Sequence, residues 1–463
     1  MRVVVSQYEG IDATPVLPLA AGVLVATLRA DAEVAAATTL AVEVVRQPIA
    51  AAVAALARPD VLGLSLYPWN AAYALAVAAA ARAAVPDALI VVGGPSVPRR
   101  PAQARAFLDA HPAVDVLVLA EGEVTFRELV RARLHGRDLA HLPGVVARAA
   151  DGDHLVTAPP ARVLDLAATG SPFLDGTFDE LWARHRERFA MVLLETNRGC
   201  PFSCTYCAAR MYNQLYDEAG AGEYGRRRSH DNVLAELHAL RAAGRLGYVI
   251  FLDDTFTINH GWVREFCRRY GDELGAPFSL HARVETVNEK MLHQLAAAGC
   301  KMITYGVESG SERVRREIMD RQVTNQRFRD VFRWTREAGI MLTCNFMLGL
   351  PGETRADLQA TLDLAEELEV LDFGYFVFYP YPGTALFKVC RDRGYLPDDY
   401  LTRPANHRAS ILTLPGLTND DIAEYFDRFT ALRRRMYLAR TGEAPPDEQT
   451  AASDHVDQLA AAG

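Results

Sequence analysis

Short apolar runs alternate with alanine-rich helical stretches along most of the chain, and this alternation restricts the fold more than any other feature. Within residues 1–148 it repeats five times. Strands separated by helices of this length form a parallel sheet with helices on both faces. We therefore predict a flavodoxin-like doubly wound sheet, with its ligand outside the carboxyl ends of the strands. The predicted strands are Arg2–Ser6, Thr39–Val45, Val61–Tyr67, Ala88–Gly93 and Val114–Leu119, and the predicted helices are Leu19–Arg29, Ile49–Ala57, Ala71–Ala84, Pro101–Ala110 and Glu123–Leu134.

The alternation stops in a turn-rich connector and then resumes. Gly144–Arg148 and Leu155–Thr157 predict a small hairpin, and Pro159, Pro160 and Pro172 follow in a stretch rich in turn-forming residues. From residue 189 about six further strand–helix units predict an incomplete (β/α) barrel, in which functional residues lie at the carboxyl ends of the strands. The predicted strands are Met191–Thr196, Tyr248–Leu252, Phe278–Ala282, Met302–Val307, Met341–Met347 and Phe373–Phe378, and the predicted helices are Ser229–Ala243, Trp262–Leu274, Asn288–Ala298, Glu312–Met319, Asn325–Glu337 and Thr354–Leu368.

A small C-terminal region follows the predicted barrel. Phe387–Arg393 and Asp420–Tyr437 have helical patterns, and the composition from Thr441 onwards predicts a disordered tail. The predicted domains are residues 1–148, a linker at 149–188, the partial barrel at 189–385, a helical region at 386–440 and the tail at 441–463.

Three cysteines lie on one loop directly after the first strand of the predicted barrel. Cys200, Cys204 and Cys207 are separated by three and then two residues, beside Gly199 and Pro201. A [4Fe–4S] cluster normally takes four cysteine ligands. The remaining cysteines are isolated and far along the chain, so a cluster here would keep one iron open, as a catalytic site requires. The alternatives are a zinc knuckle with a distant fourth ligand and three ordinary buried cysteines.

This loop resembles the signature of the radical S-adenosylmethionine (SAM) superfamily, C-x-x-x-C-x-x-C with an aromatic residue before the last cysteine, here Tyr206. The resemblance implies a [4Fe–4S] cluster on Cys200, Cys204 and Cys207, whose open iron chelates the amino and carboxylate groups of SAM. An electron from the cluster would then cleave SAM to a 5′-deoxyadenosyl radical.

Polar residues at the ends of the following strands match other elements of that superfamily. Asp253 would contact the SAM amino group, and Arg283 or its neighbour Glu285 would contact the SAM carboxylate or ribose, as would Glu308. The turn Leu348–Thr354 resembles the glycine-rich turn near the adenine. Structural explanations remain open, since Asp254 could cap the next segment and Glu308 could pair with an arginine inside the barrel.

The strand-end loops of the first domain resemble those of the cobalamin-binding domain that precedes many radical SAM domains. Paired glycines after a buried strand let the backbone approach a bulky ligand. By this resemblance, Ser65, Trp69 and Asn70 would face the corrin, Gly93, Gly94 and Pro95 would line the nucleotide tail, and Glu121, Gly122 and Glu123 would close the same edge. For Trp69 an ordinary packing role is the alternative. Cobalamin domains of the methionine-synthase type carry D-x-H-x-x-G after the first strand, but Ser6–Pro15 contains no histidine to serve as the lower cobalt ligand.

Composition restricts the partners and the compartment. A net charge of −9 with no dominant basic stripe argues against a nucleic-acid partner, and we interpret Arg226–Arg228 and Arg433–Arg435 as solvated faces or anion contacts. Ala-rich segments such as Ala71–Ala84 are too short to span a membrane. Seven scattered cysteines do not form a disulfide framework, and a metal cluster with reduced thiols indicates the cytoplasm.

Taken with the resemblance, these observations predict a cobalamin-dependent radical SAM methyltransferase that acts on an unactivated carbon. The expected substrate is a natural-product precursor or a peptide, and an external flavodoxin- or ferredoxin-type donor would supply the electrons. The alternatives are a cobalamin-dependent enzyme that rearranges or cyclises its substrate without methyl transfer, and a non-catalytic cobalamin or iron–sulfur sensor. No protein side chain can be assigned as a catalytic residue, because the cofactors carry the chemistry.

Overall fold

The computed structural model describes residues 1–8, 17–149, 152–158, 162–185, 191–218, 220, 225–370, 372–400, 407–442 and 445. These residues form two compact units. The first lies within 1–193 and 214–247, and the second within 194–213 and 248–447. In the part of the chain that the structure describes, no helix is long and apolar enough to cross a membrane.

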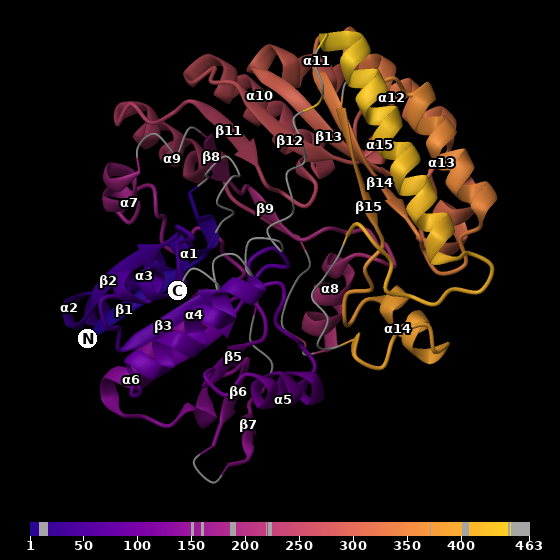
Figure 1. Ribbon diagram of the computed structural model, residues 1–463. Helices are drawn as coiled ribbons and strands as arrows, with labels where there is room; N and C mark the ends of the chain where they lie inside the picture. The colour runs from indigo at the N-terminus through magenta and orange to yellow at the C-terminus, as the bar shows by residue number, and fades with distance from the viewer. Residues whose placement is uncertain are drawn as a thin grey trace. The chain divides into compact units, whose positions relative to one another are not determined.

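The first unit contains a seven-stranded sheet in the order β2-β1-β3-β4-β5-β6-β7 (Figure 1). The first five strands pair in parallel, and their order 2-1-3-4-5 is that of flavodoxin-like sheets. The predicted fold class is therefore confirmed. The strands are β1 (Arg2–Ser6), β2 (Thr39–Glu43), β3 (Val61–Ser65), β4 (Leu89–Gly93), β5 (Val116–Val118), β6 (Val145–Arg148) and β7 (His154–Val156). The helices of this part are α1 (Leu19–Arg29), α2 (Ala32–Ala37), α3 (Ile49–Ala55), α4 (Ala71–Ala84), α5 (Pro101–Ala110), α6 (Glu123–His135) and α7 (Asp179–Arg184), and α9 (His230–Ala242) follows later in the chain.

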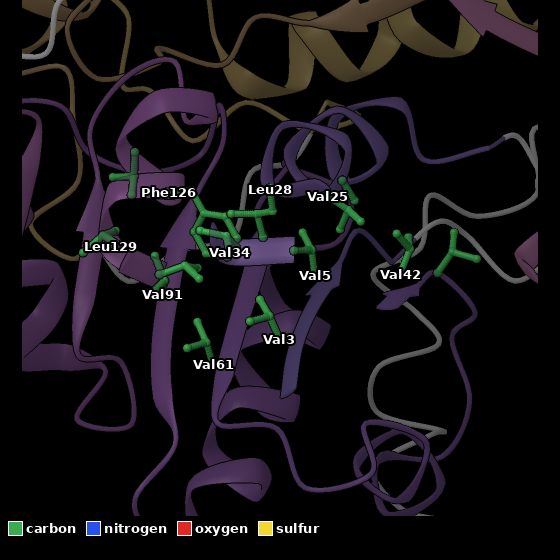
Figure 2. Packing of buried hydrophobic residues seen from close by; sticks show 14 of the residues in the cluster. Val3, Val5, Val25, Leu28, Val34, Val42, Val61, Val91, Phe126 and Leu129 are labelled. Atoms are coloured by element: carbon green, nitrogen blue, oxygen red, sulfur yellow. The ribbon is translucent and has the colours of Figure 1, made fainter. Parts of the chain in front are cut away.

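Successive residues of each central strand enter two separate hydrophobic cores. Val3 and Val5 pack with side chains of α1 and α6 on one face of the sheet (Figure 2). Val4, between them, packs with side chains of α4 and α5 on the other face. Because side chains alternate along a strand, runs that are apolar at every position fill both cores, which explains why these strands lack a polar face.

The predicted hairpin is part of this sheet. β6 pairs antiparallel to β5, with Leu117 opposite Val146, and β7 pairs antiparallel to β6. The sheet therefore continues beyond residue 148, and the predicted boundary falls inside the hairpin. Further along the predicted linker, Phe178 and Trp182 are buried in the core beside α1. Pro159 and Pro160 lie outside the described residues.

The second unit is organised around a six-stranded sheet whose strands follow chain order, β8-β11-β12-β13-β14-β15. The pairs from β11 to β15 are parallel, as an incomplete (β/α) barrel requires. The helices α11, α12 and α15 contact one face of this sheet (Figure 1). The strands are β8 (Met191–Leu194), which ends at the boundary between the units, β11 (Tyr248–Phe251), β12 (Phe278–Ala282), β13 (Cys300–Glu308), β14 (Met341–Leu348) and β15 (Asp372–Val377). The helices are α10 (His260–Glu273), α11 (Glu289–Ala298), α12 (Asn325–Glu337), α13 (Arg355–Glu367), α14 (Ala385–Asp392) and α15 (Asn419–Thr441).

Local structure differs from the prediction at two places. The predicted helix Glu312–Met319 is helical over residues 312–318, but Val314–Ile318 is π-helical and not α-helical. The fully buried Arg315 side chain, within it, donates hydrogen bonds to the carbonyl groups of Ser309 and Val323. The helix α8 (Ala208–Glu218), directly after the cysteine loop, was not predicted.

The C-terminal region packs against the last strand. Tyr375 of β15 stacks on Phe429 of α15, with 5.7 Å between the ring centroids, and its hydroxyl lies 2.8 Å from that of Thr430. The predicted tail 441–463 lies outside the described residues except at 441, 442 and 445.

Candidate cluster and cofactor sites

The cysteine loop is held in place by the two aspartates that follow β11. One carboxylate oxygen of Asp253 accepts hydrogen bonds from the backbone N–H groups of Thr196 (2.6 Å) and Asn197 (3.1 Å), and the other accepts from the Thr196 hydroxyl. Asp254 accepts from the backbone N–H of Gly199 at 3.1 Å. Asp253 is completely buried, so the structure places this predicted SAM contact underneath the loop, as a brace for it.

All three sulfur atoms have hydrogen-bonding neighbours, and the Thr255 hydroxyl lies 3.8 Å from Cys200 Sγ. The backbone N–H of Ala209, in the first turn of α8, lies 3.4 Å from Cys207 Sγ. Arg283 Nη1 lies 3.1 Å from Cys204 Sγ. Burial raises the pKa of the Cys207 thiol to about 12, so a bound cation is needed to hold it as a thiolate. These surroundings suit sulfur atoms that carry negative charge on a metal centre.

The three thiols lie on one loop, within eight residues of the chain. Among the described residues no group of three or more His, Cys, Asp or Glu could hold a single metal ion. The thiolates of a [4Fe–4S] cluster bind separate irons at its corners, and so they lie farther apart than the ligands of one ion. Three free cysteines on a braced loop are compatible with such a cluster, and Cys200, Cys204 and Cys207 stay its predicted ligands.

The predicted SAM contacts Tyr206, Arg283 and Glu308 come together with Arg321 beside this loop. Arg321 is buried and lies 3.3 Å from Glu285, and it donates to the carbonyl oxygen of Gly306 at 2.9 Å. Burial raises the pKa of Glu308, against the lowering effects of Arg321, Arg283 and a hydrogen bond from Tyr206. A polar cluster of this kind could bind the charged groups of SAM.

The backbone at Glu308 is strained. β13 loses its register with β14 between Gly306 and Glu308, and Glu308 has φ of +70°. Such a conformation costs a non-glycine residue about 1–3 kcal/mol and is concentrated at functional sites. No local sequence signal predicts it.

The turn after β14 is built around a buried carboxyl group. Glu353 Oε2 accepts from the backbone N–H groups of Gly349 (2.7 Å) and Leu350 (3.0 Å). Burial raises the pKa of Glu353 to about 8. Gly349 has φ of +81°, a conformation that favours glycine over other residues. The turn is thus stabilised by hydrogen bonds among its own residues, and Thr354 is the N-cap of α13, where it forms a capping box.

In the first unit, the loop after β3 is braced by Asn70 and presents Trp69. The backbone N–H of Tyr67 donates to Asn70 Oδ1 (2.8 Å), and Asn70 Nδ2 donates to the carbonyl oxygen of Ser65 (3.1 Å). Asn70 and Ser65 are buried, whereas Trp69 is 49% exposed and stacks on Tyr67. Trp69 therefore exposes an aromatic ring, and Asn70 holds the loop that carries it.

The loop after β4 approaches the loop after β3 closely. Gly94 has φ of +97°, and a Cβ atom at this position would lie 2.7 Å from the carbonyl oxygen of Leu66. The backbone N–H of Ser96 donates to that same oxygen at 3.1 Å. Only glycine fits this approach, whereas the neighbouring Gly93 has ordinary space, and Pro95 is exposed.

Glu121, after β5, is already paired within the protein. Arg226 binds both of its carboxylate oxygens, at 2.7 and 2.8 Å, and the backbone N–H of Glu121 donates to the hydroxyl of Tyr216 at 3.1 Å. Gly122 and Glu123 begin α6, and Glu123 is buried. The structure gives this glutamate a structural partner that sequence reasoning missed.

In each arginine run, one residue binds a carboxylate of the protein and so is an anion contact and not part of a solvated face. Arg226 and Arg433 are both buried, and Arg433 forms an ion pair with Asp372 at the start of β15. Both arginines therefore join distant segments of the same unit.

Aromatic residues gather after β15. The hydroxyl of Tyr381 lies 2.9 Å from His407 Nε2, and Tyr379 stacks on Tyr400 inside a small hydrophobic cluster. Phe376 is 42% exposed. Tyr379 has a packing role in this cluster, whereas the ring of Phe376 is partly exposed to solvent. His407 carried no sequence signal, because it comes from a segment far from the strand.

Comparison with known proteins identifies both units. The family model of the radical SAM superfamily matches residues 194–365, and that of the B12 binding domain matches residues 13–130. The chain is 29% identical over 333 residues to an uncharacterized methyltransferase, PH0819, from Pyrococcus horikoshii, which covers 71% of this chain and 69% of the relative. It is 41% identical over 205 residues to the cobalamin-dependent radical SAM methyltransferase TokK of Streptomyces tokunonensis, which covers 43% of this chain but only 29% of TokK.

A solved structure shares the fold. The apo form of OxsB, a cobalamin-dependent S-adenosylmethionine radical enzyme, matches with a TM-score of 0.71 at 18% sequence identity, covering 99% of this chain and 71% of OxsB. At this identity the match supports the fold alone.

Proposed function

Because the chain joins a B12-binding domain to a radical SAM domain, and so belongs with the cobalamin-dependent radical SAM enzymes, we propose that it transfers a methyl group to an unactivated carbon of its substrate. The observation that carries this proposal is the presence of both domains in one chain that resembles named methyltransferases over most of its length. When bound, the cluster and SAM supply a radical that removes a hydrogen atom, and cobalamin supplies the methyl group.

The chemistry explains why both cofactors are needed. A substrate carbon radical must receive a methyl group together with one electron, whereas SAM by itself donates a methyl cation. A methyl group carried by cobalamin can arrive with the matching electron. This difference in electron count favours the combination of the two domains in a methyltransferase.

The residues of the second unit have distinct proposed roles. Cys200, Cys204 and Cys207 bind the cluster, and Asp253 positions their loop. Tyr206 and Glu308 bind SAM beside the cluster, supported by their common polar network with Arg321. The turn Leu348–Thr354 lies at the carboxyl end of β14, where the adenine would be held.

The first unit would bind cobalamin through the loops after β3, β4 and β5. Trp69 offers an exposed aromatic ring, and Gly94 permits the close approach of two of these loops. The first 110 residues contain no histidine, so no imidazole from this part of the chain can occupy the lower face of the cobalt. Glu121 acts here by holding the loop through Arg226.

The substrate is proposed to be a small natural-product precursor or a peptide, and the electrons to come from a flavodoxin- or ferredoxin-type donor. The net charge of −9 is unfavourable for nucleic-acid binding. All seven cysteines are free, which is consistent with a reducing compartment such as the cytoplasm.

The products of anaerobic turnover test this proposal. One SAM molecule is consumed as the methyl source and a second as the source of the radical. We therefore expect S-adenosylhomocysteine and 5′-deoxyadenosine in roughly equal amounts for each methylated product, as this division of cofactor roles requires. Candidate substrates can be screened by mass spectrometry for a gain of one methylene unit. A modified substrate with 5′-deoxyadenosine but no S-adenosylhomocysteine would refute methyl transfer and favour rearrangement or cyclisation.

A further inference from the structure

A guanidinium group lies against one of the three cysteine sulfur atoms. Arg283, directly after β12, places its Nη1 3.1 Å from Cys204 Sγ. Sequence reasoning assigned this residue to SAM, but this N–H group points at a ligand sulfur of the cluster. Cys204 is buried, so a charge held this close to it is poorly screened by solvent.

The position of Arg283 is fixed from two sides. Its guanidinium lies over the ring of Phe202, with 3.7 Å to the ring centroid, and Phe202 belongs to the cysteine loop itself. Its Nη2 donates a short hydrogen bond to Glu285. Glu285 is held in turn by the buried Arg321, at 3.3 and 3.4 Å. The N–H···S contact therefore does not depend on a flexible side chain.

The guanidinium groups of Arg283 and Arg321 lie next to the cluster loop together with the carboxyl groups of Glu285 and Glu308. Within this group, Arg283 is the residue that donates to a cysteine sulfur. Adding an electron to the cluster adds negative charge to its sulfur atoms. Hydrogen bonds to those sulfur atoms, and positive charge near them, stabilise the reduced state more than the oxidised state.

We propose that Arg283 is a positioning residue that sets the reduction potential of the cluster, through its hydrogen bond to Cys204 and through its charge. Arg283 holds the potential above the value that three thiolates alone would give. It exchanges no proton and forms no covalent bond; the single electron comes from the external donor. The inference rests on the proposed cluster, which iron content tests separately.

The test is a redox titration of the cluster, monitored by electron paramagnetic resonance, in the full-length protein with no SAM or substrate present. Arg283→Gln removes the charge and should lower the midpoint potential. Glu285→Gln removes the shared negative charge and should raise it. Arg355→Gln is the matched control, because Arg355 lies in the same unit, is about half exposed, forms ion pairs with Asp421 and Glu424 and lies over the ring of Tyr425. The midpoint potential of the cluster in the Arg355→Gln protein should equal that of the wild type.

Iron content separates the possible results. An Arg283→Gln protein with a full cluster and an unchanged midpoint potential would overturn the inference. If that protein also bound SAM more weakly, Arg283 would instead be a SAM contact, as the sequence predicts. If the Arg283→Gln protein cannot hold a full cluster, the midpoint potential of the Glu285→Gln protein is the test. An unchanged or lowered potential in that variant would overturn the inference. A wild-type protein that binds no iron would instead refute the cluster assignment.

Discussion

At the scale of single residues, the loops of the first unit depend on one glycine out of a pair. Gly93 and Gly94 are equivalent in the sequence, but only Gly94 has a positive φ and a backbone oxygen within 2.7 Å of the position of a Cβ atom. A side chain at Gly93 would meet only ordinary contacts, the nearest at 3.7 Å from Val118. The pair therefore offers a substitution and its own matched control.

Gly94→Ala should destabilise the first unit and weaken cobalamin binding. The positive φ and the clash with Leu66 together should cost at least about 2 kcal/mol, and relief of the clash would shift the loop that meets the ligand. Gly93→Ala should change the free energy of unfolding by less than about 0.5 kcal/mol. Urea denaturation and titration with hydroxocobalamin measure both quantities. Equal effects of the two substitutions would contradict the proposed loop geometry.

At the same scale, a run of charged residues in the sequence does not reveal which of its members is buried. Arg226 belongs to a run of three arginines, and nothing in the run distinguishes it from its neighbours. Its partner Glu121 lies 105 residues away. Removing one partner of a buried ion pair leaves an uncompensated charge, so this pair links its segments more firmly than a surface contact would.

At the scale of elements, the turn between β14 and α13 makes stability depend on pH. Glu353 is buried, and its pKa is raised from 4.5 to about 8. Between these values the native state keeps a proton on Glu353 that the unfolded chain has lost. Stability must then fall as pH rises through this range.

Glu353→Gln should remove this dependence. Glutamine keeps an oxygen that accepts from Gly349 and Leu350 but does not ionise, so the variant should lose less stability than the wild type between pH 5 and pH 8, by about a few kcal/mol. Urea denaturation at a series of pH values measures the slope. Asp363→Asn, an exposed acid on α13, is the control and should keep the wild-type slope. A wild-type slope in Glu353→Gln would show that Glu353 ionises normally.

At the scale of the whole molecule, the two units should lose their cofactors independently. Replacing Cys200, Cys204 and Cys207 with alanine removes the proposed cluster ligands from the second unit. The cobalamin loops lie in the first unit, whose two hydrophobic cores include none of these cysteines. We expect the triple variant to contain no cluster and to leave SAM uncleaved, while its affinity for cobalamin stays within about twofold, since the loops proposed to bind cobalamin and the three cysteines belong to separate units.

Iron analysis, chromatography of SAM products and hydroxocobalamin titration test this expectation. The triple variant Cys267→Ala, Cys300→Ala and Cys344→Ala is the matched control, because these cysteines are buried in the same unit but lie outside the loop. It should keep its iron if it folds, as circular dichroism can check. A loop variant that retained a full cluster would refute the ligand assignment.

The sequence by itself determined the order of the elements, the class of both sheets and the cluster loop. These depend on local signals, namely the period of apolar residues along each segment and the spacing of three cysteines within eight residues. Helix α1 and strand β12 begin and end where their patterns predict. Such signals persist in the fold because each element must bury its apolar face, whatever the rest of the chain does.

Only the tertiary structure decided which polar groups meet. In the folded chain Asp253 binds the backbone beneath the loop, and Arg283 donates to Cys204. Glu121 pairs with Arg226, and the hairpin β6–β7 extends the edge of the sheet. It also made most of the predicted helix Glu312–Met319 π-helical around the buried Arg315. Each of these outcomes depends on contacts between residues far apart in the chain, where burial makes an unpaired charge or donor costly. Local sequence patterns do not predict these hydrogen-bond and ion-pair partners, because tertiary packing and not spacing along the chain determines which residues meet.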